Sequence, residues 1–160
     1  MSETTIHAGH AKLLGALDAA HMAYAVIPHR PTFTAADEAE ALGVPASAVA
    51  KTIVLATSEG FVRAVLPASE RLDLRKVREL LASREVELAT EQQLAGAYPE
   101  FDLGAVPPLG GARDAVLFDT RLGRSESVLV EAGAHDASVR LKTDDLVAHT
   151  EARIADLCSD

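Results

Sequence analysis

One stretch of the sequence places a cation where it could hold a phosphorylated ligand. Ala50-Lys51-Thr52 precedes an apolar run, so Lys51 is expected at the entry of a strand. A long, flexible ammonium there can reach over a cleft and bind a phosphate as a point charge. Taken alone, a single lysine is more often a plain surface residue, and that alternative stays open.

A second stretch offers backbone groups to a carbonyl or hydroxyl. Residues 104–111 have the sequence Gly-Ala-Val-Pro-Pro-Leu-Gly-Gly. Pro107 and Pro108 fix their own φ angles and restrict the residues before them to extended conformations. The remaining N–H donors belong to Gly104, Ala105, Val106, Leu109, Gly110 and Gly111. Rigidly held donors can orient a substrate without reorganising during reaction. The alternative is a packed connection that takes no part in chemistry.

The sequence has no Walker loop, G-x-S-x-G elbow, cysteine pair or H-E-x-x-H motif. His7 and His10 are too few for a zinc site, which needs three or four ligands, so we expect no metal. Cys158 has no neighbouring histidine and is interpreted as incidental rather than as a nucleophile. Adjacent residues point in different directions, so His135-Asp136 predicts an exposed turn, with a pocket rim as the alternative.

The elements that must position these residues alternate between helices and strands. Apolar spacing and capping residues predict helices over 11–22, 35–42, 73–82, 90–97 and 143–149. β-rich runs predict strands over 24–27, 51–56, 61–66, 86–88, 115–118, 128–131 and 138–141, with a last short element over 153–157. The alternation is not strictly βαβ. We therefore predict an α+β fold, in which a mixed, largely antiparallel sheet is surrounded by helices in a single domain spanning 1–160.

The net charge of −9 argues against tight nonspecific binding to nucleic acid. The charge is uneven, however, because residues 51–84 hold 7 basic and 4 acidic residues. A small cationic region on an acidic body is therefore expected, unless these side chains only form a solvated helix face. No apolar run is long enough to span a bilayer, and the first ten residues do not resemble a secretory signal. We therefore expect a cytoplasmic protein.

Several motifs follow one another in an order typical of one family. They are Tyr24 with His29, Thr32 to Thr34 before an acidic Ala-rich helix, Ala50-Lys51-Thr52, Leu72-Asp73-Leu74 and Gly-x-Val-Pro-Pro-x-Gly, followed by Glu131-Ala-Gly-Ala-His135, Val139-Arg-Leu and Asp145-Leu146. With these motifs the chain resembles the YbaK/prolyl-tRNA-synthetase-associated editing domain over roughly residues 10–157. Each motif is weak alone, and the order carries the assignment.

The resemblance implies a pocket for the aminoacylated 3′ CCA end of tRNA. It implies that Lys51 holds the terminal phosphate and that Gly104, Ala105, Val106, Pro107 and Pro108 form the catalytic G-x-x-x-P loop. Further pocket residues implied are Tyr24, His29, Phe33, Thr34, Gly110 and Ser138. Catalysis in the family is described as substrate-assisted through a ribose hydroxyl, without cofactor or metal. An activated ester needs mainly positioning, which agrees with a site that lacks a side-chain nucleophile.

The expected function is trans-editing: hydrolysis of the ester of tRNA mischarged with a small amino acid such as Ala, Ser, Thr or Cys. An aminoacyl-tRNA synthetase is a further expected partner, whereas membrane and DNA are not. Cysteine-editing members have an acidic residue near the position of Ser138, which disfavours cysteine. Two alternatives are a noncatalytic module that binds a tRNA end or nucleotide, and a hydrolase of small esters unconnected to tRNA.

Overall fold

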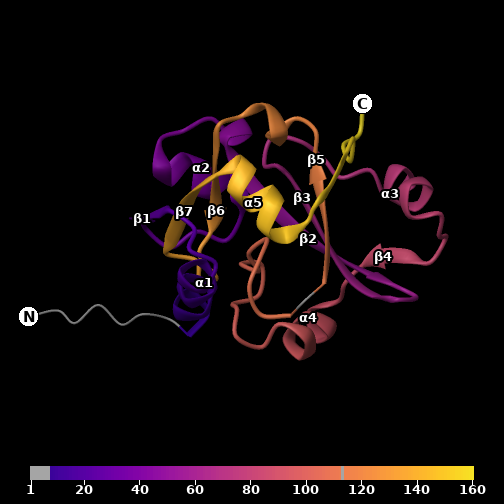
Figure 1. Ribbon diagram of the computed structural model, residues 1–160, viewed down its shortest axis with the longest axis horizontal. Coiled ribbons are helices and arrows are strands. Elements are labelled where there is room, and N and C mark those ends of the chain that lie inside the picture. The colour runs from indigo at the N-terminus through magenta and orange to yellow at the C-terminus, as the bar shows by residue number, and fades with distance from the viewer. Residues whose placement is uncertain (1–7, 113) are drawn as a thin grey trace, which may run out of the picture.

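The computed structural model describes residues 8–112 and 114–160 (Figure 1). Its helices are α1 (Ala8–Ala19), α2 (Ala35–Leu42), α3 (Leu74–Leu81), α4 (Glu91–Ala97) and α5 (Thr143–Thr150). Its strands are β1 (Tyr24–Pro28), β2 (Val49–Thr57), β3 (Gly60–Pro67), β4 (Val86–Leu88), β5 (Ala115–Asp119), β6 (Ser127–Glu131), β7 (Ala137–Lys142) and β8 (Arg153–Ala155). Each predicted helix and strand is present, most within two residues of its predicted ends.

The first helix departs furthest from its predicted range. It ends at Ala19 rather than Met22, because the chain turns at His21, whose φ is 55°. Two short 3-10 turns, Ala46–Ala48 and Leu122–Arg124, were not predicted. Turns of three residues carry too little periodicity to be seen in a sequence.

All strands belong to one eight-stranded sheet with the order β1-β7-β6-β2-β3-β5-β8, and β4 pairs with β2. Four pairings are antiparallel and three, β2–β6, β3–β5 and β5–β8, are parallel. The mixed α+β sheet is therefore confirmed, with antiparallel pairs in the majority. The parallel pair β2–β6 joins the β2–β3 and β6–β7 hairpins and brings the end of β6 beside the start of β2, while the other two parallel pairs add β5 and β8 to β3.

Local sequence signals fix the ends of the helix that matters most for the site. The Thr34 hydroxyl accepts a hydrogen bond from the Asp37 N–H at 3.1 Å and caps α2. At the other end Gly43 takes a left-handed conformation with φ of 68°, where its N–H bonds to carbonyls of the last turn. These two residues place the short helix α2 over one face of the sheet.

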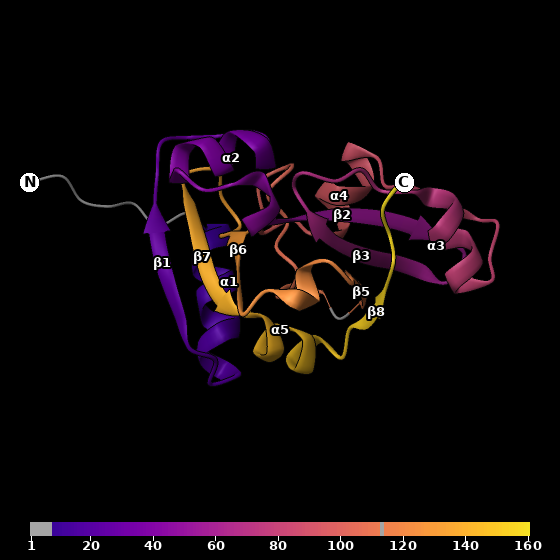
Figure 2. The ribbon, with the colours of Figure 1, turned by 90° about the horizontal axis from the view of Figure 1, so that it is seen from above.

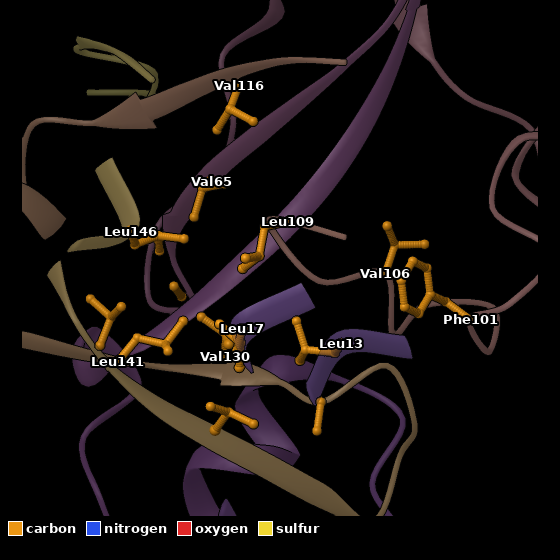
Figure 3. Packing of buried hydrophobic residues seen from close by; sticks show 14 of the residues in the cluster. Leu13, Leu17, Val65, Phe101, Val106, Leu109, Val116, Val130, Leu141 and Leu146 are labelled. Atoms are coloured by element: carbon orange, nitrogen blue, oxygen red, sulfur yellow. The ribbon is translucent and has the colours of Figure 1, made fainter. Parts of the chain in front are cut away.

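Successive residues of a strand point to opposite faces, so the sheet separates two environments. Val128 and Val130 face the main core, which is built from α1, α5 and the chain around 98–109 (Figure 3). Leu129 faces the other side and packs with α2. Figure 2 shows α2 and α5 on opposite sides of the molecule. Glu131 follows in the same alternation. No helix in the described part of the chain is long and apolar enough to cross a membrane.

Candidate functional site

A pocket of about 200 Å³ opens where β2 and β6 part. The parallel ladder between these strands has two pairs and ends at Ala50 opposite Val130. The next residue on each strand, Lys51 and Glu131, lines the pocket. The other lining residues are Phe33, Thr34, Ala35, Ala50, Thr52, Ile53, Gly104 and Val106. The end of this ladder thus gathers side chains from four separate segments of the chain.

Lys51 is a half-buried residue of β2, and burial lowers the pKa of its ammonium below 10.5. It lines the pocket and also a neighbouring groove of about 470 Å³. Ser69, Glu70 and Arg71 line that groove with it, together with apolar residues. A cation therefore lies at the border of two hollows of different size and composition.

The loop that carries the Pro-Pro sequence is packed rather than open. Residues 105–109 are all buried, and only Gly104 and Val106 of the predicted catalytic loop line the pocket. The Ala105 N–H donates to the Asp102 carbonyl at 3.0 Å, so the expectation that this donor is available to a substrate is wrong. Pro107 and Pro108 are buried and do not line this pocket.

A buried arginine on β3 holds this loop. The Arg63 side chain is 1% exposed; its Nε donates to Asp114 at 3.0 Å. Its two terminal nitrogens donate to the carbonyls of Pro107 at 2.7 Å, Gly110 at 2.6 Å and Ala112 at 3.1 Å. We call this group the Arg63 clamp. Arg63 lies within the predicted cationic region of residues 51–84, and its burial corrects that expectation; its place between apolar residues of a central strand was a signal for burial.

Tyr98 completes the clamp from the other side of the guanidinium. The Arg63 guanidinium carbon lies 4.8 Å from the Tyr98 ring centroid, which is a cation–π distance. The Tyr98 hydroxyl donates to the same Asp114 carboxylate. Burial and the Asp114 charge raise the pKa of Tyr98, so its phenol stays protonated as a donor.

Glu38 of α2, Glu131 of β6 and Ser138 of β7 form what we call the acid cluster. Ser138 pairs with Glu131 across β6 and β7, and its hydroxyl donates to Glu38. Glu38 is fully buried, and burial raises its pKa to about 7 while the Ser138 bond acts in the opposite direction. His29 Nε2 lies 2.9 Å from the Ser138 oxygen. Two predicted pocket residues, His29 and Ser138, thus support the pocket wall rather than line it.

Glu131 is the cluster member that reaches the pocket. It is 7% exposed, and burial, with the charges of Glu38 and Asp102, raises its pKa to about 9. Its Oε2 is buried and has no hydrogen-bond partner among the residues that the structure describes. Glu131 belongs to the Glu131-Ala-Gly-Ala-His135 motif but was not among the predicted site residues. A carboxylate that ends an apolar strand was the available signal.

Phe33 and His135 form the mouth of the pocket. Phe33 is 72% exposed, and its ring centroid lies 5.0 Å from that of His135. His135 Nε2 bonds to the Leu103 carbonyl at 2.8 Å. The predicted turn at His135-Asp136 is present, but its predicted exposure is wrong, since both residues are half-buried. His135 itself does not line the pocket, but it contacts Phe33, which does.

Two predicted substrate-binding residues lie elsewhere. The Tyr24 hydroxyl donates to Asp18 at 2.9 Å at the edge strand β1. Gly110 contacts α1, and its carbonyl belongs to the Arg63 clamp. Of the residues predicted for substrate binding, only Phe33 and Thr34 therefore line the pocket. His7 lies outside the described residues, and no group of three His, Cys, Asp or Glu suited to a metal occurs within 8–112 and 114–160.

Comparison with known families gives this geometry a context. The sequence model of the aminoacyl-tRNA editing domain matches residues 29–148, a range that contains every residue lining the pocket. The chain belongs to the aminoacyl-tRNA editing domain family. In this editing domain the lining residues therefore come from the matched region, whereas α1, β1 and β8 lie outside it.

Solved structures agree over nearly the full length of the editing domain. The chain is 26% identical, with a TM-score of 0.85, to a protein described as a proposed trans-editing enzyme for prolyl-tRNA synthetase, and the match covers 99% of this chain and 100% of that one. It is 25% identical, with a TM-score of 0.85, to hypothetical protein APE2540, over 92% and 99% of the two chains. The chain is also 25% identical, with a TM-score of 0.84, to a protein from a study of epitope backbone grafting on scaffold proteins; this match covers 95% of this chain and 97% of that one.

Proposed function

We propose that this editing domain hydrolyses the ester bond of mischarged aminoacyl-tRNA in trans. The observation that carries the proposal is the joint lining of one pocket by Lys51, Gly104 and Val106, at the border of a larger groove. The solved structure described as a proposed trans-editing enzyme for prolyl-tRNA synthetase supports the same reaction.

The sizes of the two hollows suit the two parts of such a substrate. The pocket of about 200 Å³ is smaller than the roughly 300–1,000 Å³ of typical ligand sites, and fits a small aminoacyl group such as Ala, Ser, Thr or Cys. The groove of about 470 Å³ has room for the terminal nucleotide. Lys51, which lines both, is then placed to hold the phosphate between them.

Catalysis follows from positioning. The ester is activated, and the ribose hydroxyl next to it can assist the attack of water, so the protein needs to orient the ester and exclude other geometries. Gly104 and Val106 present the loop backbone to the pocket, and the Arg63 clamp keeps that backbone from moving as charge develops on the carbonyl oxygen. Ala105, Pro107 and Pro108 contribute through the packing of the same loop.

An exposed aromatic side chain at a pocket mouth suits a nucleobase. Phe33 offers a ring face beside the pocket, and stacking of a base on an aromatic side chain contributes about 1–3 kcal/mol. We propose that Phe33 stacks on the base of the terminal adenosine. Thr34 holds the start of α2 and so fixes the position of Phe33.

The charge of the surface favours assisted delivery of the tRNA. Three of the cations predicted to form a basic region are paired within the chain: Arg63 with Asp114, Arg75 with Asp73 and Glu79, and Lys76 with Asp156 and Asp160. The four others, Lys51, Arg71, Arg78 and Arg84, face a chain of net charge −9, which disfavours tight binding of the tRNA backbone by this chain alone. We propose that a synthetase partner in the cytoplasm presents the mischarged tRNA.

A panel of charged tRNAs tests the proposal. Release of labelled amino acid is measured from tRNA(Pro) carrying Ala, Cys, Ser or Pro and from tRNA(Ala) carrying Ser or Gly. Wild type is compared with Lys51→Ala and with Lys12→Ala, which removes the same charge from an exposed site on α1. We expect hydrolysis of a mischarged species that falls at least tenfold in Lys51→Ala only. Wild-type rates in Lys51→Ala would show that Lys51 does not hold the phosphate.

The second candidate is a noncatalytic module that binds a tRNA end. It is favoured by the chemistry of the pocket, because none of its lining residues is a Ser, Cys or His that could attack or take a proton. The same panel separates the two, since the module would bind charged tRNA without releasing amino acid from any species.

A further inference from the structure

Glu131 is a buried acid that the proposed chemistry leaves without a task. It lines the pocket together with Lys51 and Gly104, and it is 7% exposed. Its Oε2 has no hydrogen-bond partner in the described part of the chain. A buried polar atom without a partner is destabilising and is uncommon in native proteins, so its presence in a pocket points to a ligand that completes it.

The surroundings of Glu131 indicate the charge of that ligand. Burial, and then the negative charges of Glu38 and Asp102, raise the pKa of Glu131 to about 9, so the acid is protonated in the free pocket near neutral pH. No ion pair to Glu131 is found within 8–112 and 114–160, although Lys51 lines the same pocket. A neutral ligand would leave the ionised form of Glu131 opposed by the charges of Glu38 and Asp102. A positively charged ligand would stabilise that ionised form and pair with the free oxygen.

The size of the site indicates the kind of cation. A metal ion would need three or more protein ligands, and no such group of His, Cys, Asp or Glu occurs among the described residues. An ammonium group needs only hydrogen-bond acceptors, carries three donors and is compact enough for a pocket of about 200 Å³.

We propose that Glu131 binds the α-ammonium group of the aminoacyl moiety, so that the site selects esters with a free α-amine. The inference rests on the proposed function, since it assumes an aminoacyl ester in the pocket. Lys51 and Glu131, which follow the last pair of the β2–β6 ladder, then bind opposite charges of one ligand, its phosphate and its ammonium.

A pair of esters that differ only in the α-substituent tests this assignment. Deamination of the best substrate of the tRNA panel converts its α-amine to a hydroxyl of similar size. Each enzymatic rate is divided by the rate of spontaneous hydrolysis of the same ester in buffer. For wild type we expect kcat/KM to be about ten- to a hundredfold higher for the aminoacyl than for the hydroxyacyl ester, the range expected for one charge-assisted hydrogen bond.

The isosteric variant Glu131→Gln should lose this preference by losing rate on the aminoacyl ester alone. Glu126→Gln, at an exposed position before the same strand, is the matched control and should keep it. Equal rates of wild type on both esters would overturn the proposal without any variant. An unchanged preference in a folded Glu131→Gln would overturn it as well.

Binding of stable analogues separates this inference from the proposed function. The probes are 3′-amino-3′-deoxyadenosine acylated through an amide with alanine or with lactate. Tighter binding of the alanyl probe that depends on Glu131, without hydrolysis of any ester, would uphold the ammonium site and reject the deacylase. Hydrolysis of esters together with equal binding of both probes would uphold the deacylase and reject the ammonium site.

Discussion

The Arg63 clamp and the acid cluster are both buried and polar, yet they differ in how completely their atoms are paired. In the clamp, the guanidinium donates to Asp114 and to three loop carbonyls. In the acid cluster, Glu38 Oε1 and Glu131 Oε2 are buried without a partner in the part of the chain that the structure describes. One group is complete within the protein, and the other is not.

This difference separates support from recognition. A fully paired buried charge holds its neighbours in one arrangement, and removing one member leaves the others desolvated and unpaired. An incompletely paired acid costs folding free energy that a bound ligand can return. Substitutions in the clamp should therefore act first on stability, and substitutions in the acid cluster first on pH dependence and ligand choice.

The largest effect should follow from Arg63→Met. The variant places an apolar side chain of similar length in β3, leaves the carbonyls of Pro107 and Gly110 without the Arg63 donor, and leaves Asp114 with the Tyr98 hydroxyl but without the guanidinium. We expect a loss of about 3–5 kcal/mol in the free energy of unfolding, measured by urea denaturation. Arg63→Lys, which keeps the charge but not the forked geometry, should fall between the variant and wild type. If Arg63→Met were as stable as wild type, the Arg63 clamp would not stabilise the fold.

The next largest effect is a pH-dependent one at Glu131. Its pKa is raised from 4.5 to about 9, so its contribution to stability is full below about pH 4.5 and is lost as the pH rises through 9. Glu131→Gln has no such proton to lose. Between pH 5 and 9, unfolding free energies should fall by on the order of 3 kcal/mol more in wild type than in the variant. Parallel pH profiles would contradict the burial of an unpaired acid.

Ser138→Ala should have a smaller effect within the same cluster. It removes the hydroxyl that donates to Glu38, and that bond lowers the pKa of this acid. We expect a loss of about 1–3 kcal/mol at neutral pH and a further rise of the Glu38 pKa, followed by NMR of its side-chain carboxyl carbon. Ser127→Ala, at an exposed position, serves as the control. A pKa of Glu38 that stays constant would place Ser138 outside the cluster.

Phe33→Ala should have the smallest effect on stability. The ring is 72% exposed, so unfolding free energy should change by no more than about 0.5 kcal/mol. The proposed stacking predicts instead a rise in KM for charged tRNA of about tenfold, with kcat little changed. Phe33→Tyr keeps the ring face and should keep the KM. A wild-type KM in Phe33→Ala would contradict stacking of the terminal adenine base on Phe33.

Much of the fold could be predicted because its signals are local. Thr34 and Gly43 mark the ends of α2, and alternating apolar residues mark the strands. The parallel pairing of β2 with β6 could not be predicted, because it joins residues about eighty positions apart with no turn to fix their register. That pairing is nevertheless what places Lys51 beside Glu131.

Residues of the candidate site could be predicted where a sequence motif contains them. They could not be predicted where only three-dimensional packing brings them to the site. Lys51, Gly104, Val106, Phe33 and Thr34 line the pocket as the motifs suggested. Arg63 and Glu38 were missed, because charged residues are expected at the surface and only three-dimensional contacts show them to be buried. A sequence also does not show that Gly110 faces α1 rather than the pocket.

The pocket is assembled from chain segments around 34, 51, 104 and 131, and this spacing links the proposed hydrolysis to folding. Contacts so distant in sequence form only after large loops have closed, which makes them late and slow to form. A partly folded or newly synthesised chain therefore has its helices and hairpins before it has the pocket. Ester hydrolysis would then report completion of the native fold, and premature chains would leave charged tRNA intact.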